Sequence, residues 1–85
     1  MENKYYAFRT EAEFLSIIEK LKSEGYTFPV ELDINFDMIK SCYSRNKIYI
    51  INSYYNSINK SKEFIVGTKQ IFEHNTKSKI KLSII

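Results

Sequence analysis

Two residues have side chains suited to nucleophilic or metal chemistry: the single cysteine, Cys42, and the single histidine, His74. A cysteine nucleophile needs a base beside it, and His74 is the one histidine candidate. No catalytic-cysteine signature surrounds Cys42, so we interpret it as a core residue, because cysteine is among the most often buried types. One histidine cannot build a zinc site, so we expect His74 to be an ordinary exposed residue.

Three carboxylates lie close together in the sequence, at Glu31, Asp33 and Asp37. Clustered carboxylates suit hard divalent cations, but this run lacks the glycine and the distal glutamate of a calcium loop. A solvated strand face explains the same pattern. A third hypothesis is that the row imitates nucleic-acid phosphates and occupies a basic channel of a partner protein. We predict no metal and no cofactor, and we assign the three residues to partner binding.

Tyrosines and lysines are close together in the second half of the chain, where Tyr49, Tyr54 and Tyr55 lie near Lys47 and Lys60. Aromatic rings beside positive charge form stacking surfaces for single-stranded nucleic acid. Tyrosine is also enriched in protein interfaces. The same residues therefore support a protein-binding and a nucleic-acid-binding hypothesis.

Lysine and other residues alternate near the end of the chain, at Lys77, Lys79 and Lys81. Lysines on an edge strand deter edge-to-edge association, and they can equally contact phosphate. The run 80–84 alternates as a last strand would, and a further hypothesis is a homodimer in which residues 80–85 pair as a strand between chains.

The composition indicates one domain spanning residues 1–85, with 44% hydrophobic residues and a net charge of +3. Lysines outnumber arginines eleven to two, which AT-rich coding also produces. Residues 1–37 carry net charge −4 and residues 38–85 carry +7, so we expect two faces of opposite sign. With a single cysteine, no signal-peptide pattern and no run of apolar residues long enough for a membrane, we expect a cytoplasmic protein.

The elements that must position these residues begin with a strand at 5–9 and a helix at 11–24. Thr10 and Glu13 match a capping box, and Gly25 can end the helix in a Schellman turn. An extended segment follows from Tyr26, and the alternating run 30–38 predicts a strand, with a loop at 33–37 as the alternative.

The remaining pattern predicts a hairpin of 39–43 and 47–51 around a loop at 44–46, a polar connector at 52–61, and a strand at 64–66. Thr68 caps a short second helix near 68–74. The fold class is therefore α+β, with a small, mostly antiparallel sheet of four or five strands and the main helix, about 11–24, packed on one face.

A resemblance rests on the run 6–14, on Ile18-x-x-Leu21, and on 24–28, which reads Glu-Gly-Tyr-Thr-Phe. Together with Cys42-Tyr43, 47–50 and 64–72, this pattern is similar to short open reading frames of phages and prophages of Gram-positive bacteria. The resemblance implies a phage or mobile-element origin. Small proteins of that origin often bind and block a host enzyme, including CRISPR effectors and other defence systems.

The sequence contains no phosphate loop, serine elbow or recognisable frame of paired catalytic carboxylates, so we predict that the protein is not an enzyme. The leading hypothesis is a phage-derived module that inhibits a host protein, in the host cytoplasm, by steric or electrostatic occlusion. The alternative is a basic nucleic-acid-binding protein that uses the lysines and tyrosines of the second half.

Overall fold

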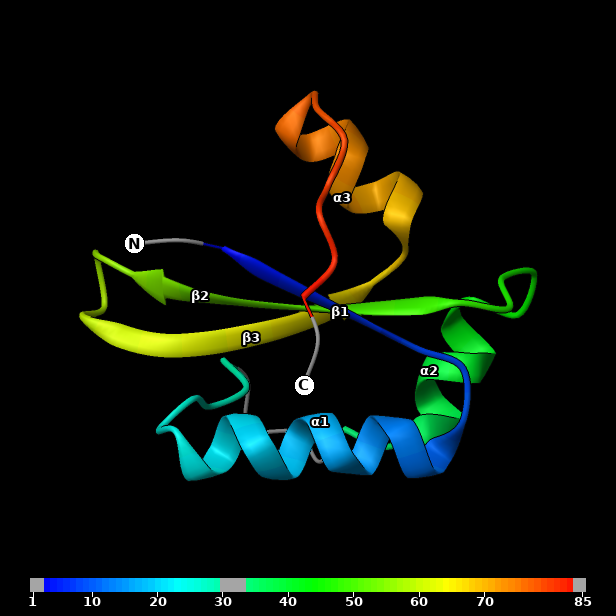
Figure 1. Ribbon diagram of the computed structural model, residues 1–85, viewed down its shortest axis with the longest axis horizontal. Coiled ribbons are helices and arrows are strands. Elements are labelled where there is room, and N and C mark those ends of the chain that lie inside the picture. The colour runs from blue at the N-terminus through cyan, green and yellow to red at the C-terminus, as the bar shows by residue number, and fades with distance from the viewer. Residues whose placement is uncertain (1–2, 30–33, 84–85) are drawn as a thin grey trace.

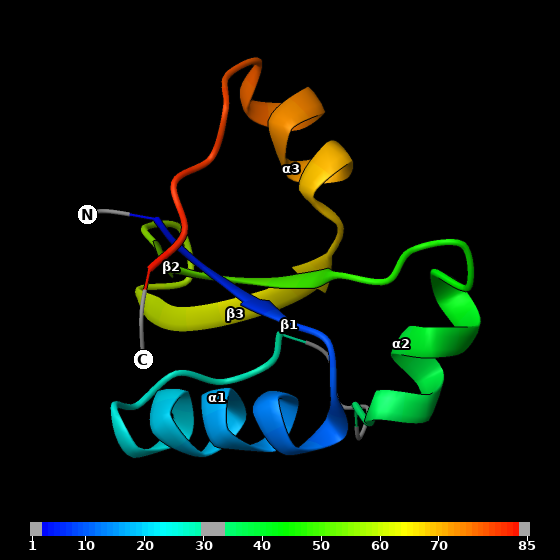
Figure 2. The same cartoon turned by 45° about the vertical axis from the view of Figure 1, so that its right-hand side comes forward.

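The computed structural model describes residues 3–29 and 34–83 and shows a small α+β fold (Figure 1). Three antiparallel strands form a sheet in the order β1-β2-β3. Helix α1 covers one face of the sheet, and α3 covers part of the other (Figure 1). Figure 2 shows α2 beside one end of the sheet. The elements are β1 (Lys4–Phe8), α1 (Glu11–Ser23), α2 (Phe36–Cys42), β2 (Tyr49–Asn56), β3 (Ser61–Gly67) and α3 (Lys69–Thr76).

Helix α1 begins and ends through hydrogen bonds local to the chain. The Glu13 N–H donates to the Thr10 hydroxyl at 3.2 Å, and the Thr10 N–H donates to the Glu13 carboxylate at 3.1 Å. At the other end the Gly25 and Tyr26 N–H groups donate to the carbonyls of Lys22 and Leu21, which is the Schellman pattern. Gly25 has φ +91°, a conformation that favours glycine. The predicted capping box and glycine stop are confirmed.

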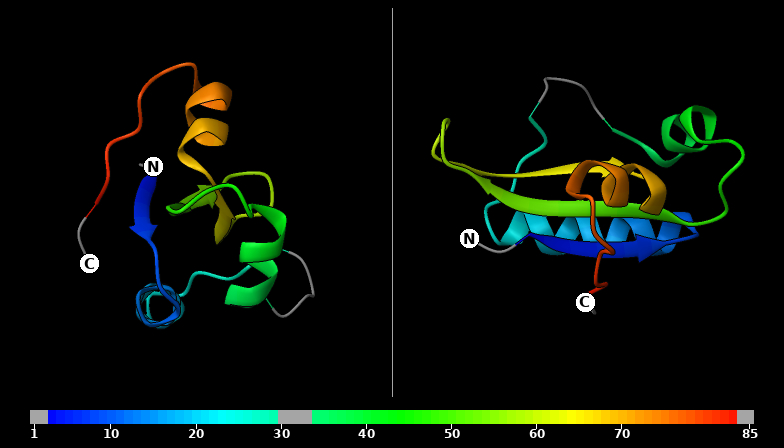
Figure 3. Two further views of the ribbon diagram at one scale, coloured as in Figure 1. Left: turned by 90° about the vertical axis from the view of Figure 1, so that its right-hand side faces the viewer. Right: turned by 90° about the horizontal axis from the view of Figure 1, so that it is seen from above.

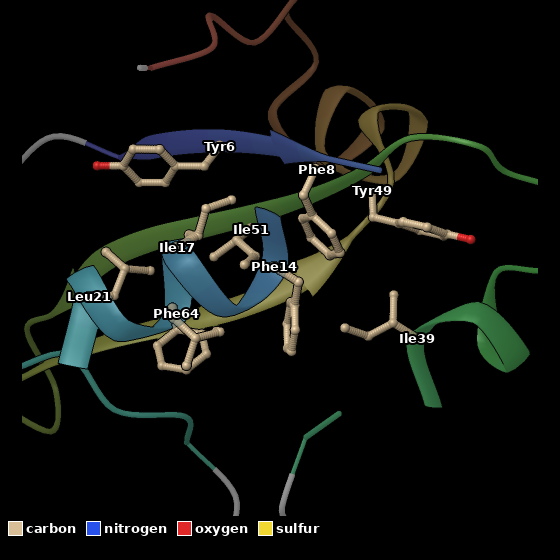
Figure 4. Packing of buried hydrophobic residues seen from close by; sticks show 10 residues of the cluster. Tyr6, Phe8, Phe14, Ile17, Leu21, Ile39, Tyr49, Ile51 and Phe64 are labelled. Atoms are coloured by element: carbon tan, nitrogen blue, oxygen red, sulfur yellow. The ribbon is translucent and has the colours of Figure 1, made fainter. Parts of the chain in front are cut away.

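The main core lies between α1 and the sheet (Figure 4). Leu21 is 0% exposed, and the rings of Phe8, Phe14, Tyr49 and Phe36 contact one another with centroids 5.2–6.3 Å apart. Because side chains alternate along a strand, β1 sends Tyr6 and Phe8 into this core and its intervening residues to the opposite face.

A second, smaller core lies under α3. Phe72 is the buried residue of α3, and its ring meets that of Tyr5 edge-on at 5.6 Å. Ile50 of β2 completes the buried cluster, with Ile65 and Ile80 packed against it. The sheet is therefore buried from both sides at this end, with separate clusters under α1 and α3.

The sheet has three strands, fewer than the four or five predicted. The segment after Gly25 meets β3 in one parallel bridge, Thr27 with Glu63, and Pro29 lacks the N–H that further pairing would need. The predicted C-terminal strand likewise pairs only at Leu82, with Tyr5 of β1 in the same chain, among the residues described. Residues 84 and 85 of the proposed dimer strand lie outside these residues.

The predicted strand at 30–38 is wrong where the structure describes it, because its second half belongs to helix α2. Asn35 caps this helix, since its side-chain oxygen accepts the Met38 N–H at 2.9 Å. Phe36 and Ile39 pack against the main core at a spacing of three residues, which is helical. Residues 30–33 lie outside the described part of the chain.

The predicted hairpin at 39–51 is also wrong, because residues 39–42 are helical and β2 continues to Asn56. The connector predicted at 52–61 supplies most of β2 and the turn before β3. Asn52 and Ser53 are buried in the middle strand, where the Asn52 amide donates to the Lys4 carbonyl at 3.1 Å. Pairing on both sides outweighed the weak strand preference of these polar residues.

Other predicted elements are confirmed. β1 matches the first strand within a residue, β3 contains the strand at 64–66, and Thr68 caps α3 by accepting the Ile71 N–H at 3.3 Å. None of the helices in residues 3–29 and 34–83 has the length and apolar character needed to cross a membrane.

Candidate functional site

The turn between β2 and β3 presents an exposed apolar side chain on an ordered loop. Ile58 is 90% exposed at this turn, far above the exposure of its strand neighbours. The Asn56 side-chain oxygen accepts the N–H groups of Ile58 and Asn59, at 3.0 and 3.1 Å. Lys60 then takes φ 54° to turn the chain into β3. Two side-chain bonds and a left-handed residue thus fix the backbone on either side of Ile58.

The carboxylate of Glu63 is buried next to this turn and is hydrogen-bonded to it. The Glu63 side chain is 5% exposed and accepts four side-chain hydrogen bonds. Tyr54 and Asn56 donate to one oxygen at 3.0 and 3.1 Å, and Ser61 and Asn59 donate to the other at 2.8 and 3.4 Å. Three of the four donors come from the turn or its flanks, so Glu63 ties the loop to the strand pair. We call Tyr54, Asn56, Asn59, Ser61 and Glu63 the hairpin network.

The hairpin network shifts the titration of its members. Hydrogen bonds from Ser61, then Asn56, hold the pKa of Glu63 below its ordinary value of 4.5, against the opposing effect of burial. Burial, followed by the hydrogen bond to Glu63, raises the pKa of Tyr54. The ion pair within the described residues, Lys20 with Glu24, belongs to α1. The Glu63 charge is therefore stabilised by neutral donors.

We expect acidification to weaken the hairpin. A carboxylate whose pKa falls on folding stabilises the fold above its unfolded-state pKa, and this contribution is lost as pH drops through the lower folded-state pKa. The melting temperature of the unmodified protein should therefore exceed that of Glu63→Gln at pH 7, and the two curves should converge as pH falls below 4.5, the ordinary pKa of a glutamate. A difference that stays constant over this range would contradict the assignment. Glu13 and Glu24, whose pKa values are also lowered, are common to both proteins.

Of the three acidic residues predicted to bind a partner, the structure describes Asp37, which lies on a helix and not on the predicted strand. Asp37 lies exposed in the first turn of α2, while Glu31 and Asp33 lie outside the described residues. Within residues 3–29 and 34–83, no group of three or more His, Cys, Asp or Glu side chains is placed to hold a metal ion.

The three tyrosines predicted to share a surface are separated. Tyr49 is 6% exposed and packs in the main core, so its assignment to a binding surface is corrected. Tyr54 and Tyr55 are adjacent on β2 and project to opposite faces, Tyr54 toward Glu63 and Tyr55, 37% exposed, toward the α1 side. The strand period of two prevents neighbours from forming one aromatic platform.

The predicted lysines form two groups. Lys47 precedes β2 and Lys60 follows it, so the eight residues of that strand hold them roughly 25 Å apart. Lys77, Lys79 and Lys81 are exposed in the segment after α3. With Lys69 at the start of α3, these lysines lie on α3 and on the segment that descends from it to β1, where Leu82 pairs with Tyr5. We call these four lysines the basic layer; in Figure 1, α3 lies on the opposite side of the sheet from α1.

The charge asymmetry along the chain is carried in part by α1 and by α3 with the segment after it, and the two helices lie on opposite sides of the sheet (Figure 1). Four glutamates and two lysines are carried by α1 and the residue after it, whereas residues 68–83 carry four lysines and one glutamate. The halves of the chain do not separate completely, because the Lys62 ammonium of the basic half donates to the Glu24 carbonyl at 3.2 Å. The two faces of opposite sign stay a prediction. Such faces orient an approaching charged partner.

The nucleophile and the base considered from the sequence lie on different layers. Cys42 is exposed at the last turn of α2, which corrects its assignment to the core, because the inward-facing residue of that helix is Ile39. His74 is exposed on α3, as predicted, on the other side of the sheet.

A small apolar hollow of about 160 Å³ lies between Phe28, α2 and Val66, where the Tyr43 hydroxyl donates to the Val66 carbonyl at 3.4 Å.

The sequence by itself did not place Ile58 or Glu63 in the candidate site. The available signal was the polar turn run 56–61 between two strand-forming segments, which is typical of a hairpin. No protein-family model, curated protein or solved structure matches the chain. The resemblance to phage reading frames stays a prediction.

Proposed function

We propose that the protein is a small binding module that attaches to a partner protein through the β2–β3 hairpin and blocks a site on that partner by covering it. The observation that carries the proposal is Ile58, 90% exposed at a turn fixed by the hairpin network. Ile58 is β-branched, so its side chain has few conformations to lose. The α1–sheet core supports the hairpin as a rigid base.

Preorganisation is the physical reason that this turn suits binding. Association lowers the entropy of loops and side chains that become ordered, and a loop already held in place avoids most of that loss. A few buried apolar anchors then supply most of an interface's affinity. Lys60 lies two residues from Ile58, so the complementary site is an apolar pocket with an acidic rim.

The partner class comes from the resemblance to phage reading frames. It suggests a host enzyme or a defence effector, CRISPR effectors among them, as the protein covered. Separation of Cys42 from His74 by the sheet supports binding in preference to cysteine-based catalysis.

Substitution of Ile58 tests the proposal. The immobilised protein should retain a defined partner from a lysate of a Gram-positive bacterium, the host class that the resemblance implies, and the purified partner should bind directly and lose activity. Ile58→Ser should weaken this binding by about 30-fold or more, the effect of losing an interface anchor. Leu15→Ser is the matched control, since Leu15 is 55% exposed on α1, remote from the turn. Equal binding by both variants, or no direct partner, would refute the proposal.

The second candidate function is nucleic-acid binding through the basic layer. It is favoured by four exposed lysines on α3 and the segment that follows it, namely Lys69, Lys77, Lys79 and Lys81. Lysines that neutralise phosphates release counterions, so the affinity for an oligonucleotide would fall steeply as salt rises.

A further inference from the structure

The segment that follows α3 lies along the outer edge of β1. In the left view of Figure 3 it descends from α3 and passes beside β1, which is an edge strand because the sheet order is β1-β2-β3. Leu82 meets Tyr5 in a parallel bridge, and the Ser83 N–H donates to the Tyr5 carbonyl at 2.7 Å. We call residues 78–83 the strap. Its position shows that this stretch of sequence fits the outer edge of β1.

Ile80 attaches the strap to the second, smaller core. Its side chain packs against that core, and its N–H donates to the Glu73 carboxylate at 3.1 Å. Leu82, which meets β1, is 49% exposed. Segments with little buried apolar surface open locally, at a free energy well below that of global unfolding. We therefore expect the strap to leave β1 while the main core under α1 stays folded.

A strained residue joins the strap to α3. Lys77, the C-cap of α3, takes φ 56° and ψ 29°, which is the left-handed conformation. This conformation is unfavourable for lysine, because the Cβ lies too close to the following carbonyl oxygen. The Thr76 hydroxyl lies 3.1 Å from the Ser78 carbonyl and helps to hold the turn. An extended Lys77 would relieve the strain and direct the strap away from its own β1.

We propose that the protein dimerises by exchanging this strap, so that residues 78–83 of each copy take the same place on β1 of the second copy. Because the copies are identical, the contacts of Ile80, Leu82 and Ser83 are all remade across the dimer. The changes are confined to the turn at Lys77 and to the entropy lost on association. The strap already occupies β1 in the monomer, so exchange is the route by which the C-terminal strand expected from the sequence would pair between chains. The inference is independent of the hairpin.

Two substitutions of Lys77 test the exchange, because they remove the same charge and differ in backbone preference. Lys77→Gly accepts the left-handed turn and should lower the dimerisation constant by about 30-fold, since neither copy then relieves strain by opening. Lys77→Val disfavours positive φ and should raise the constant by about tenfold or more. Lys79→Val is the matched control, because it removes the same charge at a residue whose φ is not positive. Sedimentation equilibrium measures the constant, and circular dichroism checks that each variant is folded.

Nuclear magnetic resonance locates the strap in the dimer. With differently labelled copies, contacts between Tyr5 and Ser83 should join one copy to the other. Such contacts within a single copy of the dimer would overturn the exchange. A protein that stays monomeric at every concentration, both unmodified and as Lys77→Val, would overturn it as well, and so would equal effects of Lys77→Val and Lys79→Val. These results leave the proposed function standing, because that is tested separately at Ile58.

Discussion

Replacing Leu21 with alanine should lower the free energy of unfolding by about 3–5 kcal/mol, whereas the same change at Leu15 should lower it by less than about 1 kcal/mol. Leu21 is 0% exposed and Leu15 is 55% exposed on the same helix. The first substitution removes buried methyl groups and leaves a cavity in the main core. The second shortens a side chain that is largely in water.

The two substitutions can be compared directly because they make the same change in the same helix and differ in the burial of the leucine. Both residues are leucines inside α1, so the gain in helix propensity on changing to alanine is common to both. A domain of 85 residues has a stability of roughly 4–13 kcal/mol, so the loss at Leu21 is a large share. Chemical denaturation followed by circular dichroism measures both values. Similar losses at the two positions would mean that α1 does not pack on the sheet through the face described.

Replacing Phe72 with alanine should release α3 from the sheet while α1 stays folded. Phe72 is 5% exposed and fills the small core with Tyr5 and Ile50, and loss of a buried phenylalanine costs about 3–5 kcal/mol. Because the two cores lie on opposite faces of the sheet, we expect the opening to be local to α3 and to the segment that follows it.

Amide hydrogen exchange measures this local opening. The amides of α3 should lose protection in Phe72→Ala, while those of α1 keep theirs. Ile71→Ala is the control, because Ile71 is the preceding residue of the same helix and is 41% exposed. Equal loss of protection in α1 and α3 would show one cooperative unit. Gly67→Ala is a second substitution that should disturb the packing of α3. The added Cβ would lie 3.2 Å from the Phe72 ring, so the ring would have to move.

The predictions from sequence succeeded where the signal is local. Thr10, Glu13 and Gly25 act within a few residues of themselves, so their types indicate the ends of α1 directly. Thr68 marks the start of α3 in the same way. β1 could be recognised because its side chains alternate between the main core under α1 and the smaller core under α3.

The predictions failed where a distant partner decides the structure. The apolar alternation around Phe36 suggested a strand, but the cap at Asn35 and packing against the main core made this segment helical. The polar residues Asn52 and Ser53 suggested a connector, but they lie in the middle strand with partners on both sides. Such pairing joins residues up to about fifty positions apart, and no local pattern records it.

The candidate site shows the same division. By itself the sequence determined the α+β class, both capped helices α1 and α3, and the opposite charges of the two halves of the chain. Only the tertiary structure showed that Glu63 lies under the turn and that Ile58 is presented at its tip. The physical reason is that caps and charge counts are properties of neighbouring residues, whereas a buried carboxylate exists only once distant segments meet.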